Sequence, residues 1–525
     1  MNTVIISENN DFLLELIKDK KISNNINVKC IISAKDGIEN IKKEVKIKDI
    51  FVYQDFKRGK IQGLKEYANN EIDYEIHKKF KDIEAESYKF LEFANPNNDK
   101  FSPRDLGQSF NNTLVFTLNF IEQYNPNLVF FTNVPHSFDT YILYKVCLKL
   151  NIKTIFKREI SLPGLYMFQN KIKIIPEVSH YNILDNSICL RNKKIFSDYQ
   201  DLIENDNKKS NAKIFSKFRN HELSKNSLYT KIPIIFYLKK TLQFIPQLFL
   251  RFIQMIYLFI VPSFFKKVFY LERFYTLGDF YLEDFSKEKN KSLKESRTSK
   301  LINDFDLFKA KIKKLKLLKE YKSVVSPVDL SKKFIYFPLH YQPEATTYPF
   351  GGMFADQIRA LRLLSVSIPE NYFIYVKEHP DTFNTSDAAW SRGDRGRDLN
   401  YYKDIQEISN VRCLDISFNS LDLINKCSHV ATIAGAVGIE SLFKNKKIIV
   451  FGYPWYCDFP NIINVNNNQE KLKNRDCFFD QKPTKIETIS LIEKYCKILF
   501  KNEDLKKQEH KQIIVDLFLQ SIKNK

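Results

Sequence analysis

A glycine turn at residues 432–441 is the segment with the clearest capacity for chemistry. It reads TIAGAVGIES, follows an apolar run and precedes an apolar-periodic segment, so it predicts a strand-to-helix turn. Glycine at 435 and 438 would let backbone N–H groups approach a phosphate, and Glu440 could accept ribose hydroxyls. Thr432 and Ser441 flank the turn as further polar candidates. The alternative is a purely structural turn in which Glu440 interacts with the helix dipole.

A lysine and a histidine stand at the end of a second predicted strand, in the sequence YVKEHPD at 375–381. Pro380 ends the strand and favours extended backbone at His379. Side chains two residues apart in a strand point the same way, so Lys377 and His379 are expected to bind a phosphate together. A structural role for the histidine is the alternative.

A proline-bounded loop, residues 338–347, follows a third predicted strand and reads PLHYQPEATT. Its polar residues alternate, so they could project to one side and orient a sugar. Gln342 is a candidate for binding that sugar, and either His340 or Glu344 could act as a general base. A stiff loop with solvated side chains is the alternative.

One candidate lies in the first part of the chain, where His136 follows the strand predicted at 128–131. There it would face the other candidates across a cleft. The alternative places it at a helix start, with Ser137 as the cap.

The elements that must position these residues alternate between buried strands and amphipathic helices, which predicts two parallel α/β sheets of the Rossmann type facing a cleft. In the first part, strands are expected at 4–6, 28–32, 50–53 and 128–131, and helices near 11–20, 73–95, 108–124 and 138–151. In the last part, strands are expected at 334–337, 372–376, 411–414, 429–433 and 447–451, and helices near 353–366, 398–408, 419–427, 437–445, 485–500 and 503–522.

The predicted domains are an N-terminal Rossmann-like domain at 1–165, a helical middle region at 166–330 and a C-terminal Rossmann-like domain at 331–525. The middle region contains an apolar segment at 241–265 that lysines flank and Arg251 interrupts. This pattern is compatible with an in-plane membrane helix, a buried hairpin or, less well, a transmembrane span.

Composition excludes several classes of protein. The net charge of +20 comes mainly from lysine, which argues against nucleic-acid binding and is compatible with an anionic membrane surface. The eight cysteines stand singly, with no C-x-x-C pair, so neither a disulfide framework nor a metal site is expected. The first residues lack the features of a secretory signal, which favours a cytoplasmic location.

Several of these stretches, in this order, resemble the capsular polysaccharide biosynthesis family that includes bacterial Kdo transferases of capsule export. The resemblance rests on residues 336–349, 376–381, 430–442 and 450–456, and on the region from Pro135 to Thr154. It implies a GT-B-like fold in which residues 1–165 form the acceptor-side domain and residues 331–525 form the domain that holds the nucleotide donor. His379 would then contact the donor phosphate, while the glycine turn and Glu440 would hold phosphate and ribose. Alanine at 434 and 436, where the family commonly has threonine, departs from the pattern.

The sequence therefore predicts a metal-independent, GT-B-like glycosyltransferase of surface polysaccharide synthesis without a cofactor. The resemblance implies that it transfers a sugar, with a Kdo-like acid as one candidate, from a nucleotide-activated donor, with a CMP-type donor favoured, to a lipid-linked or polymeric glycan at the inner face of the cytoplasmic membrane. The expected donor ligands are Lys377, His379, Gln342, Thr432, Gly435, Gly438, Glu440 and Ser441, and the catalytic candidates are His340, Glu344 and His136. Two alternatives are a CDP-polyol phosphotransferase of the teichoic-acid type and a non-catalytic polysaccharide-assembly protein.

Overall fold

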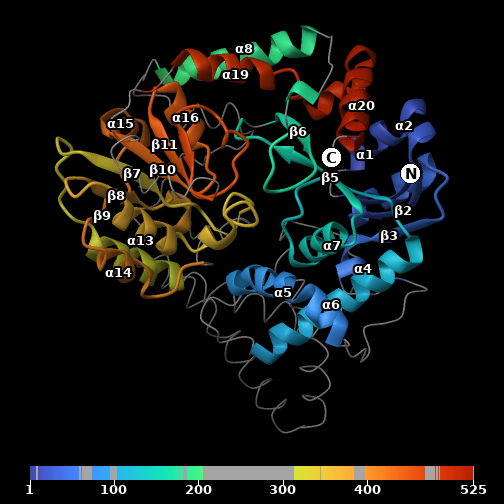
Figure 1. Cartoon of the computed structure of the whole chain (residues 1–525), viewed down its shortest axis with the longest axis horizontal. Coiled ribbons are helices and arrows are strands. Elements are labelled where there is room, and N and C mark those ends of the chain that lie inside the picture. Colours follow the sequence, from blue (N-terminus) through green and yellow to red (C-terminus); the bar gives the residue numbers. More distant parts are fainter. Residues whose placement is uncertain are drawn as a thin grey trace, which may run out of the picture.

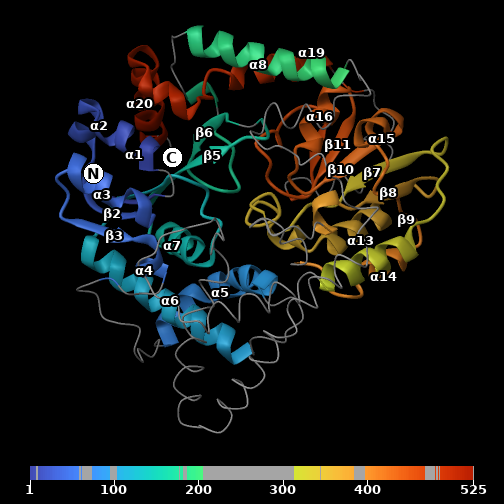
Figure 2. The same ribbon diagram turned by 180° about the vertical axis from the view of Figure 1, so that it is seen from behind.

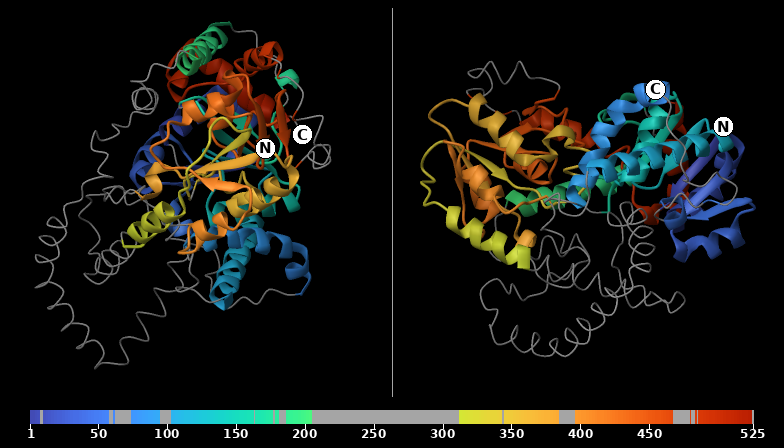
Figure 3. Two further views of the ribbon diagram at one scale, coloured as in Figure 1. Left: turned by 90° about the vertical axis from the view of Figure 1, so that its left-hand side faces the viewer. Right: turned by 90° about the horizontal axis from the view of Figure 1, so that it is seen from below.

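The structure, a computed structural model, contains two six-stranded sheets that lie side by side (Figure 1; Figure 3, right). It describes residues 1–7, 10–57, 61, 74–94, 103–162, 164–176, 178–180, 186–204, 312–342, 344–383, 396–466, 479, 483 and 485–523. The apolar segment predicted at 241–265 and most of the predicted middle region lie outside these residues. Within them, no helix is long and apolar enough to cross a membrane.

The N-terminal sheet has the strand order β3-β2-β1-β4-β5-β6, with every neighbouring pair parallel except the antiparallel β5–β6 pair. Its strands are β1 (Asn2–Ser7), β2 (Asn27–Ser33), β3 (Asp49–Val52), β4 (Leu128–Phe131), β5 (Lys153–Glu159) and β6 (Tyr166–Gln169). Its helices are α1 (Asn10–Ile17), α2 (Lys20–Asn25), α3 (Lys35–Glu44), α4 (Tyr53–Lys57), α5 (Tyr74–Ala94), α6 (Pro103–Tyr124) and α7 (Phe138–Lys149).

Alternation along the N-terminal strands builds two apolar layers. Ile5 and Ile31 face a layer with α1, whereas Val4 and Ile6 face a second layer with α6 and α7. Because both faces are covered, the central strands β1 and β4 read as apolar runs, VII and LVFF, in the sequence.

The C-terminal sheet is parallel throughout and has the order β12-β11-β10-β7-β8-β9. Its strands are β7 (Phe334–Pro338), β8 (Phe373–Lys377), β9 (Val411–Cys413), β10 (His429–Thr432), β11 (Lys447–Val450) and β12 (Ile462–Asn464). A helix over residues 312–324, α13 (Gln357–Ser367) and α14 (Tyr401–Gln406) contribute to one apolar face, and α15 (Ser420–Lys426) and α16 (Val437–Phe443) to the other. These sheets confirm the predicted pair of Rossmann-like domains.

Three further helices of the described residues pack around the two sheets. Helix α8 (Asn186–Glu204) packs against α16 and runs beside α19 (Lys485–Tyr495). Helix α20 (Gln508–Lys523) returns to the N-terminal domain, where it packs on β5, β6 and α2 (Figures 1 and 2). Thus β6 and α20, which lie beyond the boundaries predicted at 165 and 331, both belong to the N-terminal packing.

Candidate functional site

Each sheet has a switch point, where neighbouring strands are followed by connections that run to opposite faces. In the C-terminal sheet it lies between β7 and β10, because α13 follows β7 on one face and α16 follows β10 on the other. In the N-terminal sheet it lies between β1 and β4. Ligands of open α/β sheets bind outside the strand carboxyl ends at such points. The residues predicted after β4, β7 and β10 therefore occupy the edges where this rule places a ligand.

His340 joins the two loops at the C-terminal switch point. Its Nε2 lies 3.2 Å from the Thr432 hydroxyl and accepts the N–H of Ala434 at 3.4 Å. With Nε2 as the acceptor, we assign the proton of the neutral ring to Nδ1, which has no hydrogen-bond partner among the described residues. Burial, followed by the charges of His379 and Arg397, lowers the pKa of His340 to about 3. A neutral ring with an occupied Nε2 fits a positioning role better than the predicted role of base.

The glycine turn is closely packed against its neighbours. A Cβ at Gly435 would lie 2.7 Å from Nε2 of His340 and 3.2 Å from Oγ1 of Thr432. A Cβ at Gly438 would collide with the ring and hydroxyl of Tyr456, whose O–H also donates to the carbonyl of Gly435. Packing within the protein is thus enough to explain both glycines, and their predicted role toward a phosphate stays a prediction.

The other residues predicted in this turn face inward. Glu440 is only 6% exposed and accepts a hydrogen bond from the Tyr199 hydroxyl of α8 at 3.1 Å. Ser441 is fully buried, and its hydroxyl donates to the carbonyl of Val437 at 2.6 Å. The structure therefore engages both side chains in contacts within the protein.

His379 is the most accessible polar ring at this edge, since 42% of its side chain is exposed. The N–H of Asp381 donates to its Nδ1 at 3.3 Å, so we assign the proton of the neutral ring to Nε2. Its ring centroid lies 5.7 Å from that of Tyr341, in the loop after β7. His379 can therefore offer a donor to a ligand.

Lys377 does not join His379, although the sequence predicts a shared phosphate. Its Nζ donates to the carbonyl of Phe418 at 2.9 Å and to the hydroxyl of Ser420 at 2.7 Å. Its side chain thus extends toward the start of α15, and burial lowers its pKa to about 8.

Glu378 and Arg397 form a buried ion pair that sequence reasoning missed. Nε of Arg397 donates to Oε2 of Glu378 at 2.9 Å, and Nη2 donates to Oε1 at 3.2 Å. Their side chains are 0% and 1% exposed. Burial alone would lower the pKa of Arg397, but Glu378, Tyr401 and Tyr402 raise it above its ordinary value. The only signal in the sequence is the position of Glu378 between two candidates.

Gln342 and Glu344, the remaining candidates of the 338–347 loop, do not project to one side as predicted. Gln342 is buried, accepts from Nη1 of Arg397 and donates to the carbonyl of Ala355 at 2.8 Å. Glu344 is exposed and accepts from the hydroxyl of Thr346 at 3.1 Å. Gln342 therefore orients Arg397, and Glu344 is the member of this loop whose carboxylate is open to solvent.

His136 lies at the switch point of the N-terminal sheet and is partly buried. Its Nδ1 donates to the carbonyl of Val134 at 2.7 Å, which makes Nε2 the acceptor atom of a neutral ring. Ser137 and Thr140 form the capping box of α7, so Ser137 serves as the predicted cap.

The two domains meet through a segment near Tyr348. Its hydroxyl donates to the carbonyl of Glu86 at 2.5 Å, and its ring lies edge-on to Phe90 at 4.5 Å. Nearby, the Arg158 guanidinium of β5 lies 3.8 Å from the ring of Phe350 and donates to the carbonyl of Tyr453 at 2.8 Å. These contacts fix the position of one sheet relative to the other.

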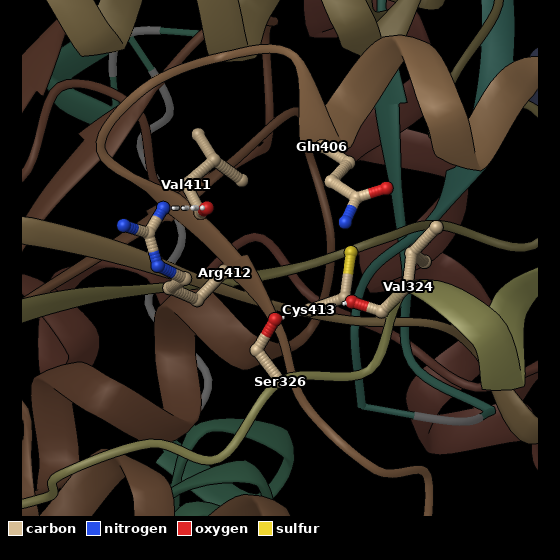
Figure 4. A pocket seen from close by; sticks show the side chains of 6 residues that line it. All are labelled: Val324, Ser326, Gln406, Val411, Arg412 and Cys413. Carbon is tan, nitrogen blue, oxygen red and sulfur yellow. Dashed lines mark hydrogen bonds between the residues drawn. The ribbon is translucent and has the colours of Figure 1, made fainter.

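A pocket of about 220 Å³ at the β9 edge is separate from these residues (Figure 4). Its lining comprises Val324, Ser326, Gln406, Val411, Arg412 and Cys413. The Arg412 guanidinium already donates to the carbonyls of Ser409 and Val411. Because it contains none of the candidates, we assign it no role in the site.

Two Rossmann-like domains with candidate residues at both switch points define a protein of the GT-B-like class. Residues 348–477 match the family described as capsule polysaccharide biosynthesis protein, so the resemblance is confirmed over this part of the chain. The match supports a role in capsular polysaccharide synthesis. No curated protein sequence matches the chain.

Solved structures give weaker likenesses. A beta Kdo 2,7 transferase, KpsC of Thermosulfurimonas dismutans, is 14% identical with a TM-score of 0.22, covering 40% of this chain and 62% of its own. The UDP-GlcNAc 2-epimerase of Methanocaldococcus jannaschii is 11% identical with a TM-score of 0.22, covering 94% and 98%. That of Neisseria meningitidis, bound to UDP-GlcNAc, is 10% identical with a TM-score of 0.20, covering 94% and 98%. The chain thus spans less than two thirds of the length of the Kdo transferase.

Proposed function

We propose that this chain is a glycosyltransferase of capsular polysaccharide synthesis that uses a nucleotide-activated sugar, with a CMP-linked Kdo-like acid as the favoured donor. The observation that carries the proposal is the half-exposed His379 at the carboxyl end of β8, next to the switch point where His340 meets the glycine turn. The family match over residues 348–477 supports the same role.

In the proposed reaction, an acceptor hydroxyl oxygen attacks the anomeric carbon of the donor sugar. The bond between this carbon and the phosphate oxygen breaks, and the nucleotide leaves with the electron pair. The Nε2–H of His379 donates to the phosphate oxygen as its negative charge grows. The acceptor proton passes to a base, for which His136 and Glu344 offer acceptor atoms in this structure, whereas Nε2 of His340 is occupied.

Metal independence is a separate part of the proposal. Lys377 extends toward α15 and not toward His379, so its positive charge does not lie beside the proposed phosphate site. Stabilisation of the phosphate charge would then rest on hydrogen bonds from His379 and from backbone N–H groups. The acceptor, a lipid-linked or polymeric glycan, and a location at the inner face of the cytoplasmic membrane are likewise proposed.

The test is incubation of the purified protein with membranes and with either CMP-Kdo or UDP-GlcNAc, followed by chromatography of the released nucleotide. We expect CMP to be released with CMP-Kdo only, with the sugar recovered in the glycan and with equal turnover in the presence of EDTA. Release of UMP or UDP only would show that the donor is a UDP-linked sugar and not a CMP-linked one. Phosphorus entering the glycan from a CDP-polyol would favour the phosphotransferase, and the absence of nucleotide binding would favour an assembly protein.

A further inference from the structure

The buried Glu378–Arg397 pair connects three segments at the carboxyl edge of the C-terminal sheet. Arg397 directs all five of its N–H groups to defined acceptors. Besides Glu378, it donates to the carbonyl of His340 at 2.9 Å, to the Gln342 side chain and to the carbonyl of Gly396 at 3.1 Å. The loop after β7 is therefore fixed to the segment that precedes α14.

The Glu378 carboxylate holds the turn that contains His379. Its Oε1 accepts the backbone N–H of His379 at 2.7 Å and the hydroxyl of Thr382 at 3.2 Å. The Tyr402 hydroxyl donates to Oε2 at 2.7 Å. The N–H of Thr382 also donates to the carbonyl of His379 at 3.0 Å, which closes the turn around the carboxylate. The orientation of the His379 peptide thus depends on a charge that lies behind it.

Burial makes this arrangement rigid. The carboxylate accepts five hydrogen bonds, from Arg397, His379, Thr382 and Tyr402, and the Arg397 side chain is only 1% exposed. A fully satisfied buried network fixes its members in one geometry, because any displacement leaves a charge unpaired in a medium of low polarity. Side chains at a binding site gain precision when such a support holds them.

We propose that the Glu378–Arg397 pair is the positioning element that holds the imidazole of His379 in the orientation needed to meet the phosphate of the nucleotide donor. The proposal rests on the proposed function for the identity of the ligand. The support of the His379 turn can be tested without any ligand.

The experiment compares Glu378→Gln with Asp504→Asn. Asp504 is the matched control, because its carboxylate is also fully buried in an ion pair, with Arg191, but it belongs to the turn before α20 on the N-terminal side. One readout is CMP affinity by titration calorimetry together with Tm. The other is ¹⁵N NMR of ligand-free, histidine-labelled protein, in which the tautomer signals of His379 are assigned with His379→Ala.

We expect both variants to lower Tm, but only Glu378→Gln to weaken CMP binding, by about tenfold or more. In the NMR experiment, the wild type should show a single His379 tautomer protonated at Nε2. Glu378→Gln should give averaged signals, and Asp504→Asn should not. Equal CMP affinity and an unchanged His379 tautomer in Glu378→Gln would overturn the proposal.

Two other outcomes also decide the question. If the wild type binds no nucleotide, the proposed function fails and the His379 signals alone decide the positioning role. If Glu378→Gln does not fold, Tyr402→Phe replaces it, since this change removes one hydrogen bond to the carboxylate and keeps the ion pair. A shifted His379 signal in Tyr402→Phe supports the proposal, and an unshifted one contradicts it.

Discussion

His379 differs from the other predicted donor ligands in its exposure. Removal of one donor to a developing oxyanion costs about 3–4 kcal/mol elsewhere, so His379→Ala is expected to lower turnover roughly 10²- to 10³-fold. Its stability should stay within about 0.5 kcal/mol of the wild type, as for most surface substitutions. Turnover and urea unfolding would be measured beside His77→Ala, an exposed histidine of α5. Equal turnover in the two variants would exclude His379 from the reaction.

Lys377 gives the protein a pH dependence of known sign. Burial lowers its pKa from 10.5 to about 8. Between these values the unfolded chain keeps a proton that the folded protein releases, so the stability contribution of Lys377 rises with pH in this window. Relative to Lys377→Met, the wild-type free energy of unfolding should increase by up to about 3 kcal/mol from pH 8 to 10.5. Urea titrations at several pH values test this, and parallel curves would contradict it.

Among the elements, the glycine turn after β10 leaves little space for a side chain at Gly435 or Gly438. Gly435→Ala would press a Cβ against the ring of His340, and overpacking of this kind costs about 1–3 kcal/mol. We expect lower stability and weaker CMP binding by calorimetry. The control is Gly107→Ala in α6, where the Cβ would lie 3.4 Å from the Tyr88 hydroxyl and should stabilise the helix by about 0.5–1 kcal/mol. Unchanged CMP affinity in Gly435→Ala would make the turn purely structural.

The strands that hold the candidates were predictable because they are buried on both faces and read as apolar runs, as β4 and β7 do. Strand β5 was not predicted, because it reads KTIFKRE. Two of its cationic residues, Lys157 and Arg158, are buried by contacts that the sequence cannot reveal. Lys157 lies over the rings of Phe12 and Tyr166, and Arg158 reaches the other domain.

Sequence reasoning located the candidates at strand ends but not their partners. The position of His379 follows from a strand and a proline, both of which are local signals. The contact of His340 with Thr432 joins residues 92 positions apart, and the Glu378–Arg397 pair joins loops that no pattern connects. Such contacts depend on the tertiary arrangement, which propensity and periodicity do not encode.

For the whole molecule, Arg158 is one of the residues that hold the two domains together. Arg158→Ala removes charged hydrogen bonds to Gln169 and Tyr453 and a cation–π contact, which should cost roughly 2–4 kcal/mol. We expect a larger radius of gyration by small-angle X-ray scattering. Lys157→Ala, equally buried in the same strand, contacts Phe12, Tyr166 and Asn502 and should lose stability without expansion. The same radius in both variants would contradict this.

Membrane binding through residues 241–265 is also a property of the whole molecule. If this segment lies in the membrane plane, flotation with vesicles should require anionic lipid and weaken in high salt, because the Debye length falls from about 10 Å at 0.1 M to about 3 Å at 1 M. Leu250→Asp and Phe259→Asp should abolish flotation. Absence of flotation on anionic vesicles would exclude the interfacial helix, and flotation that resists both salt and alkaline carbonate would indicate a span.

The return of α20 to the N-terminal sheet affects how the chain is made on the ribosome. Phe518 of α20 packs against Phe130 and Phe168, so the hydrophobic layer of the first domain is completed only by residues synthesised more than 300 positions after β6. At a synthesis rate of about 5–20 residues per second, this layer stays open for roughly 20–70 seconds. During that interval β5 and β6 expose an apolar surface to the cytosol, where chaperones would meet it before the second domain is finished.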